Sequence, residues 1–186
     1  MRTKTNILLA SALIITAVLL SCNNISESIQ RDVFINTKAI SFTIPKISDT
    51  DSIILIKDIN TKSLNLDSLI NGQSDKFGAK NIKGIKIKDF KLALLDTNSL
   101  NNIQNIETII VTVRASGQDS LIIARTNPSN TKASKLTIPI VTGSPDLKTY
   151  LTSPTFSYNL TGILRTATTK ELKAEVTATY TVTVGL

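Results

Sequence analysis

Few side chains in this chain can support covalent or metal chemistry. The 186 residues include no histidine and a single cysteine, Cys22. Catalytic triads and dyads built on histidine, and zinc sites built on histidine and cysteine, are therefore excluded. No phosphate-binding loop, dinucleotide-binding pattern or EF-hand pattern occurs. A pair of carboxylates could still support hydrolysis, but most of the acids fall at predicted turns, so we expect a protein that is not an enzyme and that uses no cofactor.

The fourteen acidic residues make a weak case for a metal site. Asp49 and Asp51 could, together with Asp75, hold Ca²⁺ through their carboxylate oxygens. Most of the acids, however, fall at predicted turns, where aspartate is favoured because its side chain bonds to the neighbouring backbone. We therefore favour solvated turn residues and expect no metal.

Lysines are densest between residues 76 and 91, at Lys76, Lys80, Lys83, Lys86, Lys88 and Lys91. Lys86 and Lys88 alternate with apolar residues, which places both ammonium groups on the solvent side of a strand. Four lysines are thus candidates for contact with lipopolysaccharide phosphates, lipid headgroups or an acidic protein: Lys83, Lys86, Lys88 and Lys91. Salt would weaken such an attraction. The interpretation that we favour is a lysine-guarded exposed strand that resists edge pairing. Nucleic acid is not an expected partner, because few aromatic residues interleave.

Three serines stand in an Asp-Ser-apolar pattern: Ser52, Ser68 and Ser120. The pattern resembles an O-glycosylation site of some envelope proteins, and this resemblance implies modification of the three hydroxyl groups. Each serine also falls at a predicted strand start or turn, where Asp-Ser is common for backbone reasons. Both interpretations stay open.

The beginning of the chain has the composition of an export signal. Arg2 and Lys4 form a positively charged start without acids, and residues 7–20 carry no charge. This apolar run fits the central region of a signal peptide and falls short of the roughly 18 to 20 residues that span a bilayer. We therefore predict a signal peptide and no transmembrane helix here.

The end of this run, Leu19-Leu20-Ser21-Cys22, resembles the lipobox of bacterial lipoproteins. The resemblance covers only the first 22 residues. It implies attachment of diacylglycerol to the Cys22 thiol, cleavage before Cys22 and acylation of the new amino group. Two or more acyl chains anchor a protein stably, whereas one does so only marginally.

The residue after the cysteine is Asn23 and not the aspartate that favours inner-membrane retention in well-studied lipoproteins. The resemblance therefore implies delivery to the outer membrane. Residues 23–31 lack the dense acidic run that resembles a surface-export signal, so the periplasmic face is slightly favoured over the cell surface.

We divide the chain into a cleaved signal at residues 1–21, a lipidated tether at 22–31 and a single domain at 32–186. Cleavage would leave 19 of the 21 basic residues against 14 acidic ones, a net charge of +5. A chain of this length forms one domain that buries about 70% of its unfolded surface.

Alternating apolar and polar residues predict strands through most of this domain. The predicted strands span residues 32–44, 52–57, 81–95, 107–114, 120–125, 135–141, 155–164 and 171–185. The alternation of the last strand is the longest in the chain. Most aromatic side chains of the domain fall on parities that we assign to the core. The first strand is apolar on both parities, with Phe34, Ile40, Phe42 and Ile44 on one and Val33, Ile35 and Ala39 on the other.

Local signals refine this pattern. The parity of the apolar residues flips across Lys88 and Asp89, which predicts a β-bulge. Strands 107–114 and 120–125 form a predicted hairpin at the centre of a sheet, and Pro139 places the strand that contains it at a sheet edge. A short helix is predicted at 66–71, and Asp146 could cap another turn.

About eight strands with frequent turns predict an antiparallel β-sandwich of immunoglobulin-like or related topology. The domain also resembles small uncharacterised envelope lipoproteins of Bacteroidota, in which a Leu-x-x-Tyr-Leu turn precedes the last pair of strands. Residues Leu147 to Leu151 carry this motif here. The resemblance implies no activity.

From these observations we expect a lipid-anchored, non-catalytic module that binds an envelope protein partner through its loops or edges. The alternative is a carrier or binder of a small apolar or glycan ligand, which would need a cavity or an aromatic platform. A hydrolase, the third class, would need two acids that face each other in a cleft.

Overall fold

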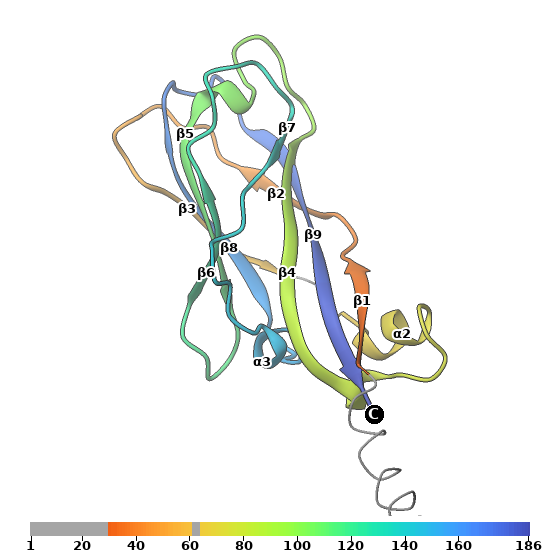
Figure 1. The fold of residues 1–186 in the computed structure, drawn as a ribbon. Coiled ribbons are helices and arrows are strands. Elements are labelled where there is room, and N and C mark those ends of the chain that lie inside the picture. The colour runs from red at the N-terminus through yellow and green to blue at the C-terminus, as the bar shows by residue number, and fades with distance from the viewer. Residues whose placement is uncertain (1–29, 61–63) are drawn as a thin grey trace, which may run out of the picture.

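The computed structural model describes residues 30–60 and 64–186 (Figure 1). The predicted signal peptide, Cys22 and the tether up to residue 29 lie outside the described residues. The described chain forms nine strands: β1 (Gln30–Asn36), β2 (Ile40–Ile44), β3 (Ile54–Asn60), β4 (Ile82–Leu94), β5 (Ile106–Arg114), β6 (Leu121–Thr126), β7 (Lys135–Thr137), β8 (Ser157–Leu164) and β9 (Leu172–Gly185). It also forms two short helices and two 3₁₀ turns: α2 (Leu66–Asn71), α3 (Lys148–Leu151), η3 (Ala79–Asn81) and η4 (Ile103–Asn105). None of the described helices has the length and apolar composition that crossing a bilayer requires.

The strands form two antiparallel sheets. In sheet A the order is β1-β9-β4-β7, and β2 pairs with the same edge of β9 further along. In sheet B the order is β3-β8-β5-β6. The predicted β-sandwich is therefore confirmed. The order β2-β9-β4-β7 opposite β3-β8-β5-β6 is that of a jelly roll and differs from the immunoglobulin order, because the last strand lies inside its sheet.

Strand β9 pairs along both of its edges. Its residues alternate between buried and partly exposed positions from Leu172 to Val184, which confirms the predicted alternation. β4 pairs with one edge of β9 over nearly the whole length of β9. β2 pairs with the first part of the other edge, and β1 pairs with its last part. One face of sheet A is therefore dry and the other is in water, as is usual for an antiparallel sheet.

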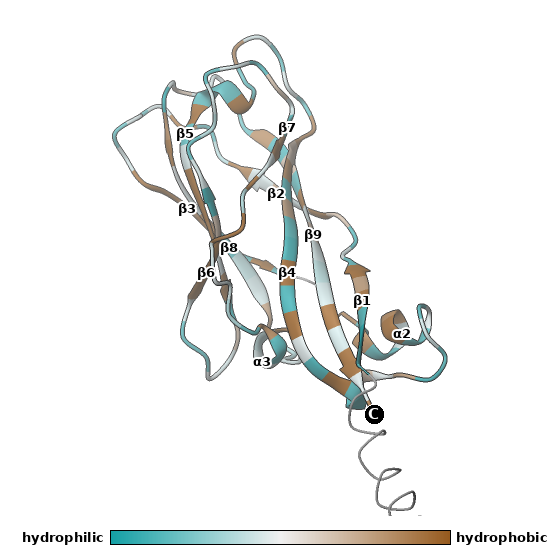
Figure 2. Cartoon of the chain, in the orientation of Figure 1, coloured by the Kyte–Doolittle hydropathy of each residue, from teal (hydrophilic) through white to brown (hydrophobic). Residues whose placement is uncertain are grey.

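Two β-bulges in β4 shift its pairing register with β9. The register shifts between Ile87 and Asp89, which confirms the predicted bulge, and also between Ile82 and Gly84, where none was predicted. Each bulge inserts one residue without a partner on β9. The inserted residues are lysines, so the apolar side chains of β4 keep facing the core although their sequence parity changes. Figure 2 shows the resulting alternation of hydrophobic and hydrophilic residues along β4.

The predicted strand 32–44 is interrupted in the structure. At Thr37 the backbone N–H donates to the Ala178 carbonyl, and the hydroxyl accepts from the Ala178 N–H, both at 2.9 Å. The interruption reverses the parity, so Phe42 packs against the core whereas Phe34 is 49% exposed. Phe34 is thus an exception to the expectation that most aromatic side chains face the core.

The chain itself closes the side of the sandwich next to β7. β7 pairs only with β4, which confirms its edge position. Near Pro139 the chain crosses to sheet B: the Ile138 N–H donates to Phe90 of β4 at 2.9 Å, and the Val141 N–H donates to Ile123 of β6 at 3.0 Å. β5 and β6 form the predicted hairpin, but β6 ends its sheet and is covered by this crossing segment.

The predicted short helices are present. α2 occupies residues 66–71, and the Asn65 side chain accepts a hydrogen bond from the Ser68 N–H at 2.9 Å. Asp146 accepts from the Lys148 N–H at 2.8 Å at the start of α3. The same carboxylate oxygen accepts from the Ile85 N–H at 2.9 Å, which attaches the α3 turn to β4.

A pair of phenols joins the two sheets in the core. Tyr158 of β8 and Tyr180 of β9 are fully buried, and their hydroxyl groups hydrogen-bond to each other. Phe90 and Phe156 pack edge-on against Tyr158, with ring centroids 5.2 and 5.1 Å away. Burial raises the pKa of both phenols. Each therefore stays neutral in the core and needs the other as a hydrogen-bond partner.

We predict that losing one phenolic hydroxyl destabilises the fold about as much as losing both. Tyr158→Phe or Tyr180→Phe alone leaves a buried hydroxyl without its partner, which costs about 1–3 kcal/mol in the free energy of unfolding. The double variant leaves no such group, so its loss should not exceed that of the single variants. Urea titrations of the full chain measure all three differences.

Losses that add up in the double variant would contradict the mutual hydrogen bond. The pH dependence is a second readout of the same variants. Because the folded pKa of both phenols is raised above the unfolded value of about 10, their contribution is present below that pH and is lost as the pH rises above it. The wild type should lose stability above about pH 10 more steeply than the double variant.

Candidate functional site

The four predicted contact lysines are all exposed on the outer side of β4: Lys83, Lys86, Lys88 and Lys91. Lys76 and Lys80 are also exposed but lie in the connection before β4. We call the outer surface formed by β1, β9 and β4 the lysine face, which consists of Phe34, Lys83, Lys86, Lys88, Lys91, Thr177, Thr179, Thr181 and Thr183.

Edge protection explains less of this row of lysines than the sequence indicates, because β4 is not the last strand of its sheet. Sheet A continues beyond β4 on both sides. β9 pairs with one side, while β7, Ile138 and Asp146 bond to the other. These bonds reach the outer edge of β4 at Ile85 and from Phe90 to Leu94, so the strand that the sequence favoured as exposed and lysine-guarded has neighbours along much of both edges. The lysines point from the interior of a sheet to the solvent.

Phe34 is the member of the lysine face that the sequence pattern missed. Its neighbours Val33 and Ile35 are buried, and Phe34 itself points outward. In the sheet register, Phe34 and Lys86 both pair with Thr181, from opposite sides. The Lys88 Nζ lies 3.9 Å from the centroid of the Phe34 ring, a cation–π contact. The bulge at Lys88 brings this ammonium across β9 to the ring.

The positive charge of this surface is only partly balanced. The strands of sheet A present six lysines and three acids to the outside: Lys83, Lys86, Lys88, Lys91, Lys135 and Lys173 against Asp32, Asp89 and Glu175. Asp89 forms an ion pair with Lys91 at 2.8 Å. Asp32 accepts a hydrogen bond from the Thr183 hydroxyl at 2.7 Å. No salt bridge of the described residues includes Lys83, Lys86 or Lys88.

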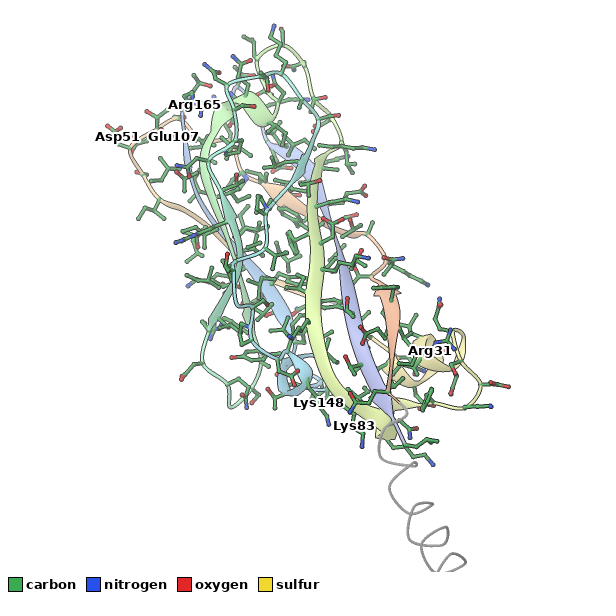
Figure 3. The ribbon with its side chains drawn as sticks, in the orientation of Figure 1. Arg31, Asp51, Lys83, Glu107, Lys148 and Arg165 are labelled. Atoms are coloured by element: carbon green, nitrogen blue, oxygen red, sulfur yellow. The ribbon has the colours of Figure 1, made fainter. Side chains whose placement is uncertain are left out.

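Cations also gather at the end of the sandwich where β1 begins. Figure 3 shows Arg31, Lys83 and Lys148 at this end and Asp51 and Arg165 at the opposite one. The Arg165 guanidinium donates to three backbone carbonyl groups, so its role is to hold loops together. The end next to the predicted tether is thus continuous in charge with the lysine face.

The three candidate calcium ligands do not converge. Asp49 accepts a hydrogen bond from the Ser52 hydroxyl and, at 2.9 Å, from the Asp51 N–H, and these two bonds lower the pKa of Asp49. Asp75 lies between α2 and η3, at the other end of the sandwich from Asp51 (Figures 1 and 3). Within residues 30–60 and 64–186, no three His, Cys, Asp or Glu side chains are grouped for a metal ion. The geometry at Asp49 is that of a hydrogen-bonded turn.

The three serines of the Asp-Ser-apolar pattern are exposed: Ser52, Ser68 and Ser120. Ser52 precedes β3, Ser68 lies in α2 and Ser120 precedes β6. All three hydroxyl groups are on the surface, and their O-glycosylation stays a prediction.

A buried cluster of amides was not predicted. Asn101, Asn102 and Asn105, in the connection from β4 to β5, are all buried. Asn101 exchanges two hydrogen bonds with Thr169, at 2.7 and 2.8 Å, and Asn105 donates to the Thr166 hydroxyl at 3.0 Å. These bonds tie the β4–β5 connection to the β8–β9 connection. Because the amides are satisfied inside the protein, the cluster is structural.

Two hollows among the described residues differ in size. The first is an apolar cleft of about 50 Å³ between the edges of β2 and β3, with walls that include Phe42, Ile44, Ile54 and Ile56. A cavity of about 150 Å³ is needed to hold benzene, so this cleft is too small for such a ligand. The second is an open groove of about 400 Å³ between α2 and α3, with walls that include Leu64, Leu66, Leu151, Pro154 and Phe156.

Comparisons with known proteins do not identify a family. No family model and no curated protein matches the chain. The structure has a weak likeness to crystal structures of the BFDV capsid protein. The decameric form is 12% identical and has a TM-score of 0.34, with 82% of this chain and 99% of that chain covered. The 60-mer form is 10% identical and has a TM-score of 0.36, with 86% of this chain and 95% of that chain covered. At TM-scores this low, neither likeness supports an inference about this chain.

Proposed function

We propose that this protein is a lipid-anchored, non-catalytic binding module of the bacterial envelope, held on the outer membrane through Cys22. The lipobox-like residues Leu19 to Cys22 support the anchor. The missing histidines and the lone cysteine support a role without catalysis. β1 begins at Gln30, so a tether of eight residue steps separates the proposed anchor from the sandwich.

The lysine face is the observation that carries the binding role. Four lysines project from one strand inside a sheet, beside an exposed phenylalanine and a row of threonines. A surface of this kind attracts anionic partners at long range and loses that attraction in salt. We propose that the module binds an anionic component of the envelope through this face, on the periplasmic side of the membrane.

The groove between α2 and α3 supports the second candidate, a carrier or binder of a small apolar or glycan ligand. Its volume of about 400 Å³ falls within the usual range for ligand sites. Its walls combine apolar side chains with the polar groups of Asn65, Asp67 and Ser153. The lysine face is the stronger observation, because its functional groups converge on one exposed surface.

We predict that Cys22→Ala abolishes lipid attachment. The thiol is the acceptor of the diacylglycerol, so the variant should incorporate none of a fatty-acid analogue supplied to cells that express it. Asn24→Ala, which keeps the thiol, is the control and should be labelled like the wild type. Label that persists in Cys22→Ala would refute the anchor.

A second prediction concerns the anionic partner. Affinity purification of the anchored wild type, with crosslinker and mild detergent, should recover a reproducible envelope component. Lys86→Glu together with Lys88→Glu should lose it, because the substitutions reverse the charge in the middle of the face. Both side chains are exposed, so the fold should be retained.

The matched control carries the same charge change away from the face, as Lys57→Glu together with Lys132→Glu. It should recover the component at the wild-type level. Absence of any reproducible component would contradict a protein partner, and equal recovery with both double variants would contradict binding by the lysine face.

A further inference from the structure

We infer that the lysine face lies against the anionic phospholipid surface of the membrane that carries the anchor, so that the sandwich lies on its side. The inference rests on the proposed lipid anchor and names the partner of the face. In this arrangement the Phe34 ring lies at the interface between lipid headgroups and acyl chains, next to the ammonium group of Lys88.

The dimensions of the chain allow this arrangement. β4 runs along the long axis of the sandwich (Figure 1). From Gly84 to Lys91 it runs alongside six residue steps of β9, from Thr183 to Thr177, or about 20 Å at about 3.3 Å each. The eight steps from Cys22 to Gln30 reach at most about 28 Å when extended. Since β1 belongs to the same sheet as β4, a chain anchored at Cys22 can place the whole face on the surface.

The chemistry of the face matches a layer of phosphate headgroups. Each lysine holds its ammonium group on a flexible stem above the sheet, and an anionic lipid surface attracts lysines that come within a Debye length. Strand β9 lies between Phe34 and the lysines of β4 and presents only threonines there. Their side chains are short, so this part of the outer surface is flat. An exposed aromatic ring among lysines is typical of a surface that enters the membrane interface.

The opposite side of the sandwich carries less positive charge. The strands of sheet B contain three cations against two acids: Lys57, Arg114 and Arg125 against Asp58 and Glu107. Large apolar side chains are exposed there, at Leu55 and Ile122, and the three cations lie on three different strands and do not form a row. The three acids on the outside of sheet A offset three of its six lysines, and Asp89 does so directly in an ion pair with Lys91, so this side keeps a net positive charge. The charge therefore selects sheet A as the side that meets the membrane.

The test uses the lone cysteine of the chain. When Cys22 carries its lipid, a cysteine introduced elsewhere is the single free thiol and can take a fluorophore. Thr177→Cys places the reporter on the lysine face, and Thr112→Cys places a matched reporter on the outer side of sheet B. Both threonines are half-buried residues of inner strands. The lipidated full chain is reconstituted into vesicles that contain phosphatidylglycerol and a headgroup-bound nitroxide quencher.

The reporter at position 177 should be quenched several-fold more than the reporter at position 112. The difference should disappear in high salt, in vesicles of phosphatidylcholine alone, and after Lys86→Glu with Lys88→Glu. Phe34→Ala should reduce it. Equal quenching at both positions, in protein whose intact mass includes the lipid, would overturn the inference.

The outcomes separate this inference from the proposed anchor. If the mass shows no lipid, the anchor fails, and the same reporters in a Cys22→Ala background are then mixed with the vesicles. Preferential quenching at position 177 would still support membrane contact by the face, and its absence would overturn it. Soluble polyphosphate that binds the protein when vesicles do not would assign the face to a free polyanion and overturn the membrane version.

Discussion

The unbroken alternation of β9 constrains the rest of sheet A. From Leu172 to Val184 every second residue is buried, and β9 contains no bulge that could absorb a mismatch. Its partners must therefore adapt to it. β4 does so with two inserted residues, and the first predicted strand does so by breaking at Thr37 into β1 and β2. Tyr180, in the middle of β9, then bonds to Tyr158 of the facing sheet.

The lysine face is a direct product of these adjustments. Counted from Ile82 with a strict period of two, Lys86 and Lys88 would point into the core. The first bulge turns them outward, and the second keeps Lys91 outward while Phe90 returns to the core. The break at Thr37 has the same effect on β1, where it leaves Phe34 exposed. Because the inner face of β9 stays buried throughout, the lysines of β4 and the exposed Phe34 ring of β1 come to lie on the same outer surface.

The sequence predicts the parts of this structure that depend on local pattern. The alternation of β9, the helix at 66–71 and the bulge at Lys88 each follow from neighbouring residues. The jelly-roll order, the hydrogen bond between the two tyrosines and the amide cluster around Asn105 depend on segments far apart in the chain, so no local pattern contains them. The outward direction of Phe34 was not predicted for the same reason, because it depends on how Thr37 pairs with Ala178. The four lysines were predicted, and their setting inside a sheet was not.

Chemical footprinting of lysines tests the central claim most directly. The lipidated protein would be acetylated on vesicles with and without anionic lipid, and the reactivity of each lysine read by mass spectrometry. The account predicts that anionic lipid protects Lys83, Lys86, Lys88 and Lys91 and leaves Lys57 and Lys132 fully reactive. Equal reactivity of the two groups on both kinds of vesicle would contradict a functional lysine face.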